Sequence, residues 1–163
     1  MSDKAQFESH ALNLGKVVGN LLMLEMGARM VIVKVDQRAA EQVQTQLPQV
    51  RTGDLVELNA FTNGDDLTET LEKYNKRAPL DCRVDVMPIV RLRDALGHGR
   101  TFGFGSMNHL RLLKFSRKSM DGKVSVELAT DMTEEWFREN IRMLIEALEK
   151  MRKALDYERR EFV

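Results

Sequence analysis

Three side chains that could do acid-base chemistry on a phosphate ester stand close together near the middle of the chain. Their segment reads Arg93-Asp94-Ala95-Leu96-Gly97-His98-Gly99-Arg100. Because side chains four residues apart share one face of a helix, Asp94 and His98 are expected to lie one above the other, with Arg93 on a neighbouring row. Histidine changes charge close to neutral pH, and arginine keeps its charge and can hold a phosphate by two hydrogen bonds. The segment is therefore predicted to bind an anion and to move protons on it.

Two glycines, Gly97 and Gly99, flank His98. They remove bulk around the imidazole and could supply the left-handed residue with which many helices end. We therefore expect His98 at an accessible helix end. The alternative is an ordinary helix end, in which the imidazole contacts terminal carbonyl groups and Arg93 pairs with Glu25 or another acid.

The segment from Arg93 to Gly99 resembles the signature of the HEPN domains, an all-helical superfamily in which an arginine, an asparagine or aspartate, and a histidine end a helix. The resemblance implies a metal-independent endoribonuclease without a cofactor, in which Arg93, His98 and Asp94 are catalytic. It also implies a homodimer whose two arginine and histidine sets line one cleft. Cleavage by the ribose 2′-hydroxyl would leave 2′,3′-cyclic phosphate ends.

The resemblance leaves the activity open. Asp94 stands where asparagine is the commoner residue, and its charge could weaken RNA binding or be neutralised by Arg91 or Arg100. The family also includes members without nuclease activity, which act as dimerisation or nucleotide-sensing modules or as partners of nucleotidyltransferase antitoxins. Two hypotheses follow: a ribonuclease toxin or defence protein, and an inactive dimer that binds a nucleotide, RNA or a protein partner. A third is a helical scaffold in which the motif is accidental.

Charge is balanced over the whole chain but not along it. The sequence has 25 basic and 25 acidic residues, which argues against a general nucleic-acid coat. Between residues 89 and 118, however, only Asp94 opposes seven basic residues: Arg91, Arg93, Arg100, Arg111, Lys114, Arg117 and Lys118. Four of these form the predicted phosphate-binding rim, which could instead be a solvated surface: Arg91, Arg100, Arg111 and Lys114.

Other features bound the class of protein. At 163 residues the chain is predicted to be a single domain, 1–163. Its one cysteine, Cys82, cannot form an intrachain disulfide, and the apolar stretch 17–35 is interrupted by charged residues. We therefore expect a soluble cytoplasmic protein with no membrane partner. No metal-ligand spacing is present, so metal catalysis is not expected.

Hydrophobic periodicity predicts an all-α fold, an antiparallel bundle of about four helices with a small β-hairpin before the C-terminal helix. The expected elements are a helix over 4–34 that continues or restarts over 36–47, a loop over 49–64, a helix from 67 to about 76 capped by Asp66, a motif helix starting near Asp85, a loop over 101–106, strands over 110–115 and 123–128 joined by Asp121-Gly122, and a helix from Thr133 to about 161.

Small residues recur every four positions on the first predicted helix, at Ala11, Gly15, Gly19 and Gly27, with Met23 between them. A second helix backbone can come close to such a ridge. The ridge could pack inside the monomer or could form a homodimer contact. The other two histidines, His10 and His109, are expected to have structural roles.

Overall fold

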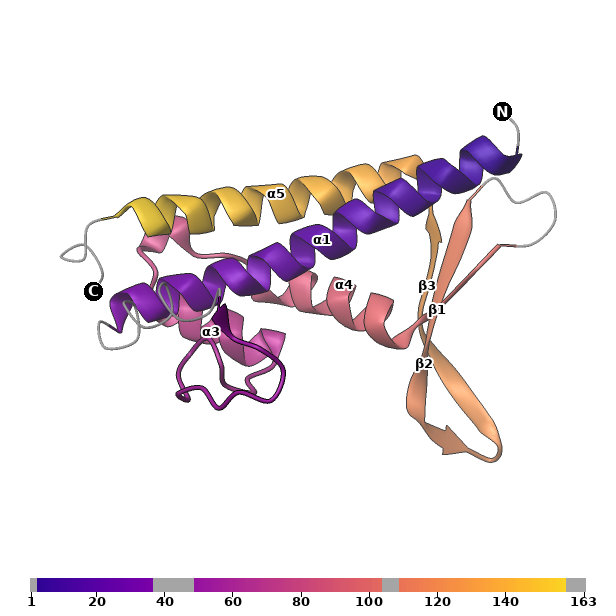
Figure 1. Ribbon diagram of the computed structural model, residues 1–163. Coiled ribbons are helices and arrows are strands. Elements are labelled where there is room, and N and C mark those ends of the chain that lie inside the picture. Colours follow the sequence, from indigo (N-terminus) through magenta and orange to yellow (C-terminus); the bar gives the residue numbers. More distant parts are fainter. Residues whose placement is uncertain (1–2, 37–48, 104–108, 158–163) are drawn as a thin grey trace. The chain divides into compact units, whose positions relative to one another are not determined.

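The computed structural model describes residues 3–36, 49–103 and 109–157 (Figure 1). The helices are α1 (Asp3–Val35), α3 (Leu67–Arg77), α4 (Val86–His98) and α5 (Glu134–Asp156), with a short 3-10 helix, η2 (Leu80–Cys82). Three strands, β1 (Arg100–Phe102), β2 (Leu110–Met120) and β3 (Lys123–Met132), lie between α4 and α5. The fold is mainly helical, and the predicted long first helix, motif helix and C-terminal helix are present. The predicted helix over 36–47 falls almost entirely outside the described residues.

The chain forms two compact units. The first contains Met1–Leu21 and Met87–Leu144, and the second contains Leu22–Val86 and Ile145–Val163. Helices α1 and α5 each contribute residues to both units, and the candidate motif belongs to the first.

The first unit contains an antiparallel sheet with the strand order β1-β2-β3. The predicted hairpin forms through Asp121 and Gly122, which both have positive φ angles, 52° and 73°. The prediction of an all-α fold with only a small hairpin is wrong, because β1 adds a third strand. Its Arg100 and Thr101 pair with Leu113 and Leu112, although residues 101–106 were predicted to be a loop.

The last helix begins where the sequence predicts. The Thr133 hydroxyl accepts a hydrogen bond of 3.1 Å from the backbone N–H of Trp136, which is the N-cap interaction expected for threonine. Phe137 and Leu144 on α5 are buried in the first unit. His10 on α1 is also buried, with its ring centroid 6.1 Å from that of Phe137, which agrees with the structural role predicted for it.

In the second unit, local hydrogen bonds fix α3 and the segment that follows it. The Asp66 side chain accepts a hydrogen bond from the Glu69 N–H while the Glu69 side chain binds the Asp66 N–H, so the predicted capping box is present. The buried Tyr74 hydroxyl donates to the Cys82 carbonyl over 2.8 Å. Burial raises the pKa of this phenol, so it stays a donor at neutral pH.

A buried arginine organises the loop before α3. The Arg29 guanidinium binds the Glu25 carboxylate, the Ala60 and Asp65 carbonyl oxygens, and Oδ1 of Asn63. Glu25, considered from the sequence as a partner of Arg93, pairs with Arg29, which is four residues away on α1.

The ridge of small residues on α1 divides into two parts. A Cβ at Gly27 would lie 3.3 Å from Sδ of Met151, so this glycine packs inside the second unit. At Gly15 and Gly19 a Cβ would meet no other atom of the described chain within 4 Å. Internal packing therefore accounts for Gly27, while the described residues leave the ridge open at Gly15 and Gly19.

Candidate functional site

His98 is the last residue of α4, and its side chain is 46% exposed. The helix begins at Val86, directly after the expected Asp85 and two residues before Pro88. Nε2 of His98 lies 3.6 Å from Oδ1 of Asp94, as their spacing of four residues predicts. The imidazole is thus exposed at a helix end, with a carboxylate beside it.

The two glycines around His98 do not have the conformation expected from the sequence. Neither Gly97 nor Gly99 has a positive φ angle, so the prediction of a left-handed helix end is wrong. Gly99 is instead needed for close packing. A Cβ at this position would overlap the Ala95 carbonyl oxygen and would lie 2.8 Å from Cδ1 of Leu112 on β2. The missing side chain lets β2 pass next to the end of α4.

Lys114 on β2 joins the helix to the sheet. Its Nζ lies 2.5 Å from Oδ2 of Asp94 and 2.8 Å from Oε2 of Glu127 on β3. The carboxylate of Asp94 therefore pairs with Lys114 and not with Arg91 or Arg100, the two partners considered from the sequence.

These contacts shift the pKa values of both partners in the directions that favour their charged forms. The hydrogen bond from Lys114 lowers the pKa of Asp94 against the opposing influence of burial, and the nearby positive charges of Lys114 and Arg117 add to the lowering. The hydrogen bonds to Asp94 and then Glu127 raise the pKa of Lys114. Both groups are charged at neutral pH.

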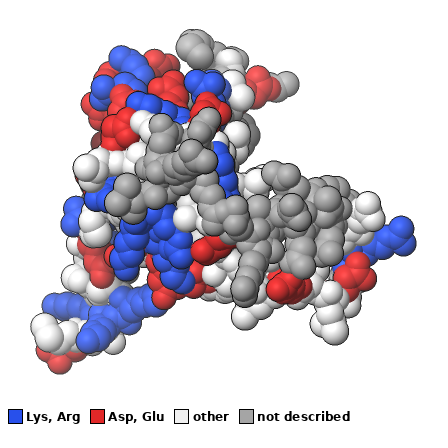
Figure 2. All heavy atoms as spheres, turned by 90° about the vertical axis from the view of Figure 1, so that its left-hand side faces the viewer, with Lys and Arg blue, Asp and Glu red and all other residues white. Residues whose placement is uncertain are grey.

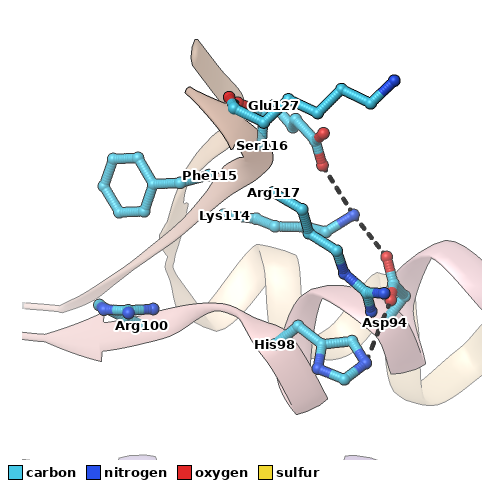
Figure 3. A pocket seen from close by; sticks show the side chains of 9 residues that line it. Asp94, His98, Arg100, Lys114, Phe115, Ser116, Arg117 and Glu127 are labelled. Carbon is cyan, nitrogen blue, oxygen red and sulfur yellow. Dashed lines mark hydrogen bonds and ion pairs between the residues drawn. The ribbon is translucent and has the colours of Figure 1, made fainter. Parts of the chain in front are cut away.

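A polar pocket of about 610 Å³ opens beside the end of α4 (Figure 3). The helix, the start of β1 and the facing parts of β2 and β3 contribute its lining residues, which are Asp94, His98, Arg100, Lys114, Phe115, Ser116, Arg117, Lys118 and Glu127. Four of these are basic and two are acidic. With a neutral imidazole the pocket has an excess of two positive charges, so it is suited to an anion.

The pocket brings together part of the set predicted from the sequence. Asp94, His98, Arg100 and Lys114 line it, whereas Arg91, Arg93 and Arg111 do not.

The side chains outside the pocket have other surroundings. Arg91 is exposed on α4, and a guanidinium nitrogen of Arg93 lies 3.9 Å from where a Cβ of Gly97 would be, so this side chain runs along its own helix. Arg111 and His109 both lie near Asp131 on β3, at 3.6 and 3.4 Å. The position of His109 agrees with the supporting role predicted for it.

Five lining residues were not predicted as part of the site: Phe115, Ser116, Arg117, Lys118 and Glu127. The excess of basic residues between positions 89 and 118 was the available signal for Arg117 and Lys118. It did not indicate which of the basic side chains face His98, because that depends on how β2 pairs with β1 and β3.

Among the described residues, no group of three or more His, Cys, Asp or Glu is placed to hold a metal ion. None of the described helices is both long and apolar enough to cross a membrane. Comparisons with protein-family models, with curated proteins and with solved structures find no match to this chain.

Proposed function

We propose that this chain is a metal-independent endoribonuclease of the HEPN type, acting as a toxin or defence protein, with His98 as its acid-base residue. The observation that supports this most is the exposed imidazole of His98 in a pocket with excess positive charge. A phosphodiester is an anion of suitable chemistry for such a pocket, and an imidazole can exchange protons with its ester oxygens near neutral pH.

The proposed reaction needs two proton transfers. A base removes the proton from a ribose 2′-hydroxyl, and the 2′-oxygen then forms a bond to phosphorus. The bond from phosphorus to the 5′-oxygen breaks, and an acid protonates that oxygen, leaving a 2′,3′-cyclic phosphate and a 5′-hydroxyl. His98 supplies one of these groups, and the basic side chains around it stabilise the charge that develops on the phosphate oxygens.

A second copy of the chain would supply the second acid-base group. The HEPN resemblance implies that two protomers share one cleft. The reaction needs both a base and an acid, and His98 is the one histidine among the residues lining the pocket. The His98 imidazole of a second copy would therefore supply the other group. RNA and a second copy are therefore the proposed partners, and an antitoxin of the nucleotidyltransferase type is a further one.

The test is cleavage of labelled RNA in excess chelator. We expect cleavage by the wild-type protein and a loss of at least about a hundredfold in His98→Ala, the usual contribution of a general acid or base. His109→Ala is the matched control, because it removes an imidazole that pairs with Asp131 outside the pocket lining, and it should retain activity. Equal cleavage by His98→Ala, or activity that requires an added metal ion, would contradict the proposal.

One observation favours a second candidate, an inactive HEPN-like dimer that binds a nucleotide, RNA or a protein partner. Both carboxylates in the pocket lining, Asp94 and Glu127, are bound by Lys114, so each is committed to an ion pair. Binding of RNA without cleavage at any pH between about 6 and 8 would support this candidate over the nuclease.

A further inference from the structure

The pairing between β2 and β3 is interrupted where these strands line the pocket. Phe115 pairs with Val126 and Ser119 pairs with Val124, so three residues of β2 between them stand opposite Ser125 alone. These three residues are Ser116, Arg117 and Lys118, and all of them line the pocket. Extra residues of this kind form a β-bulge, which bends the strand and redirects side chains.

The Ser116 hydroxyl bridges the two strands at the bulge. It donates a hydrogen bond of 2.8 Å to the Lys118 carbonyl and accepts one of 3.1 Å from the Ser125 N–H. A single side chain thus replaces ladder bonds that the bulge removes. This hydroxyl therefore links the two residues that flank Arg117, Ser116 and Lys118.

The bulge directs Arg117 toward Asp94 and His98. Figure 3 shows the guanidinium of Arg117 reaching from β2 to the space beside Asp94 and His98. No carboxylate within the described part of the chain forms an ion pair with Arg117, Arg100 or Lys118, whereas Lys114 is held by two. Arg117 is therefore a cation beside the imidazole with hydrogen-bond donors available for a ligand.

Positive charge continues from the pocket along the hairpin. Arg117, Lys118 and Lys123 lie in its outer half, where Asp121 is the acidic residue, and Figure 2 shows Lys and Arg gathered on this projection at the lower left. An extended polyanion matches such a surface better than a small anion does, because its successive phosphates can contact both the pocket and the hairpin.

We propose that Arg117, positioned by the bulge that Ser116 holds, is the residue that binds a backbone phosphate of an RNA strand beside His98. The inference rests on the proposed function for the identity of the anion and adds the residue that binds it. Ser116 is a positioning residue, since it acts through Arg117.

The experiment separates binding from cleavage by using a fluorescently labelled single-stranded oligonucleotide made entirely of 2′-deoxynucleotides. This probe has no 2′-hydroxyl and cannot undergo the proposed reaction. We expect Arg117→Ala to weaken its binding by about tenfold, because a charge-assisted contact is lost. Arg138→Ala, the matched control on α5, removes an arginine that pairs with Glu135 outside the pocket lining, and it should change the affinity by less than about twofold. The opposite ranking, or no binding by the wild-type protein, would overturn the proposal.

The salt dependence of binding distinguishes the loss of a phosphate contact from the loss of the hydroxyl that positions Arg117. Affinity for a single strand decreases as salt concentration rises, and the slope of log affinity against log salt concentration becomes less steep by about 0.7 for each phosphate contact removed. Arg117→Ala should show this change. Ser116→Ala should weaken binding by about threefold, and Ser116→Thr, which keeps the hydroxyl, should bind as the wild type does. Ser119→Ala is the control, because Ser119 lies in the paired part of β2, and it should have no effect. Equal binding by Ser116→Ala and the wild type would exclude the positioning role.

Two further outcomes separate this inference from the proposed function. If RNA is not cleaved but Arg117→Ala still weakens binding of the deoxynucleotide probe, the nuclease proposal fails and the phosphate site stands. Inorganic phosphate serves as a competitor. Displacement of the probe by equimolar phosphate would mean that free phosphate is the ligand, and the assignment to a nucleic-acid strand would then be wrong.

Discussion

At the scale of single residues, the candidate site depends on how Lys114 neutralises Asp94. The spacing of Asp94 and His98 predicted their contact, because helical geometry alone brings them together. The sequence did not predict that a lysine twenty positions further along would hold the carboxylate, or that Arg117 would face the imidazole. Both facts follow from strand pairing, which depends on residues far apart in the chain.

The ion pair between Asp94 and Lys114 predicts a pH dependence of stability. The hydrogen bond from Lys114 holds the pKa of Asp94 below its ordinary value of 3.8. A carboxyl whose pKa is lowered by folding stabilises the protein above its unfolded pKa, and this contribution is lost as the pH falls through the folded value. Because Asp94 is partly exposed, we expect the wild type to exceed Asp94→Asn in free energy of unfolding by about 0.5–1 kcal/mol at neutral pH.

Urea unfolding of both proteins at about pH 7 and about pH 3 measures this dependence. The difference between them should shrink on acidification. In a Lys114→Met background the same comparison should show little difference at either pH, since the partner that lowers the pKa of Asp94 is absent. A difference that is constant with pH in the wild-type background would contradict the assignment.

At the scale of elements, the sequence predicted the caps and turns that depend on neighbouring residues, but it did not predict the strand pairing that depends on residues farther apart. The capping box at Asp66, the N-cap at Thr133 and the turn at Asp121-Gly122 each involve residues within a few positions of one another, and all three are present. Strand β1 has three residues, and its partners on β2 follow it by about ten positions. A strand this short has no periodicity of its own, so the three-stranded sheet was missed.

The junction between α4 and β1 predicts opposite effects for two substitutions by alanine. At Gly99 a Cβ would lie 2.8 Å from Cδ1 of Leu112 and 3.0 Å from the Leu113 carbonyl oxygen, so Gly99→Ala should destabilise the protein by about 1–3 kcal/mol. At Gly97 it would make only an ordinary contact inside α4, so Gly97→Ala should stabilise by about 0.5–1 kcal/mol. Denaturant unfolding measures both, and a Gly99→Ala protein as stable as the wild type would contradict the close packing at Gly99.

At the scale of the whole molecule, net charge and exposed apolar surface bear on the proposed pairing of two chains. The formal net charge of the chain is zero, so two copies meet without long-range repulsion. Helix α1 has exposed large apolar side chains in the part that belongs to each unit: Phe7, Leu12 and Val18 in the first, and Leu22, Met23 and Met26 in the second. The open positions at Gly15 and Gly19 would let another backbone approach the helix closely.

If the proposed nuclease works as a pair of chains that meet through α1, breaking the pair should also remove activity. Leu12, 61% exposed on α1, and Leu58, 78% exposed in the loop before α3, form a matched set for substitution by glutamate. Sedimentation should show a dimer for the wild type and for Leu58→Glu and a monomer for Leu12→Glu, because a buried charge strongly opposes association. RNA cleavage should fall in parallel with the dimer fraction, since each monomer brings one His98 to the reaction. A wild-type protein that is monomeric at concentrations at which it cleaves RNA would require a second acid-base group within the same chain, and the shared cleft would then have to be abandoned.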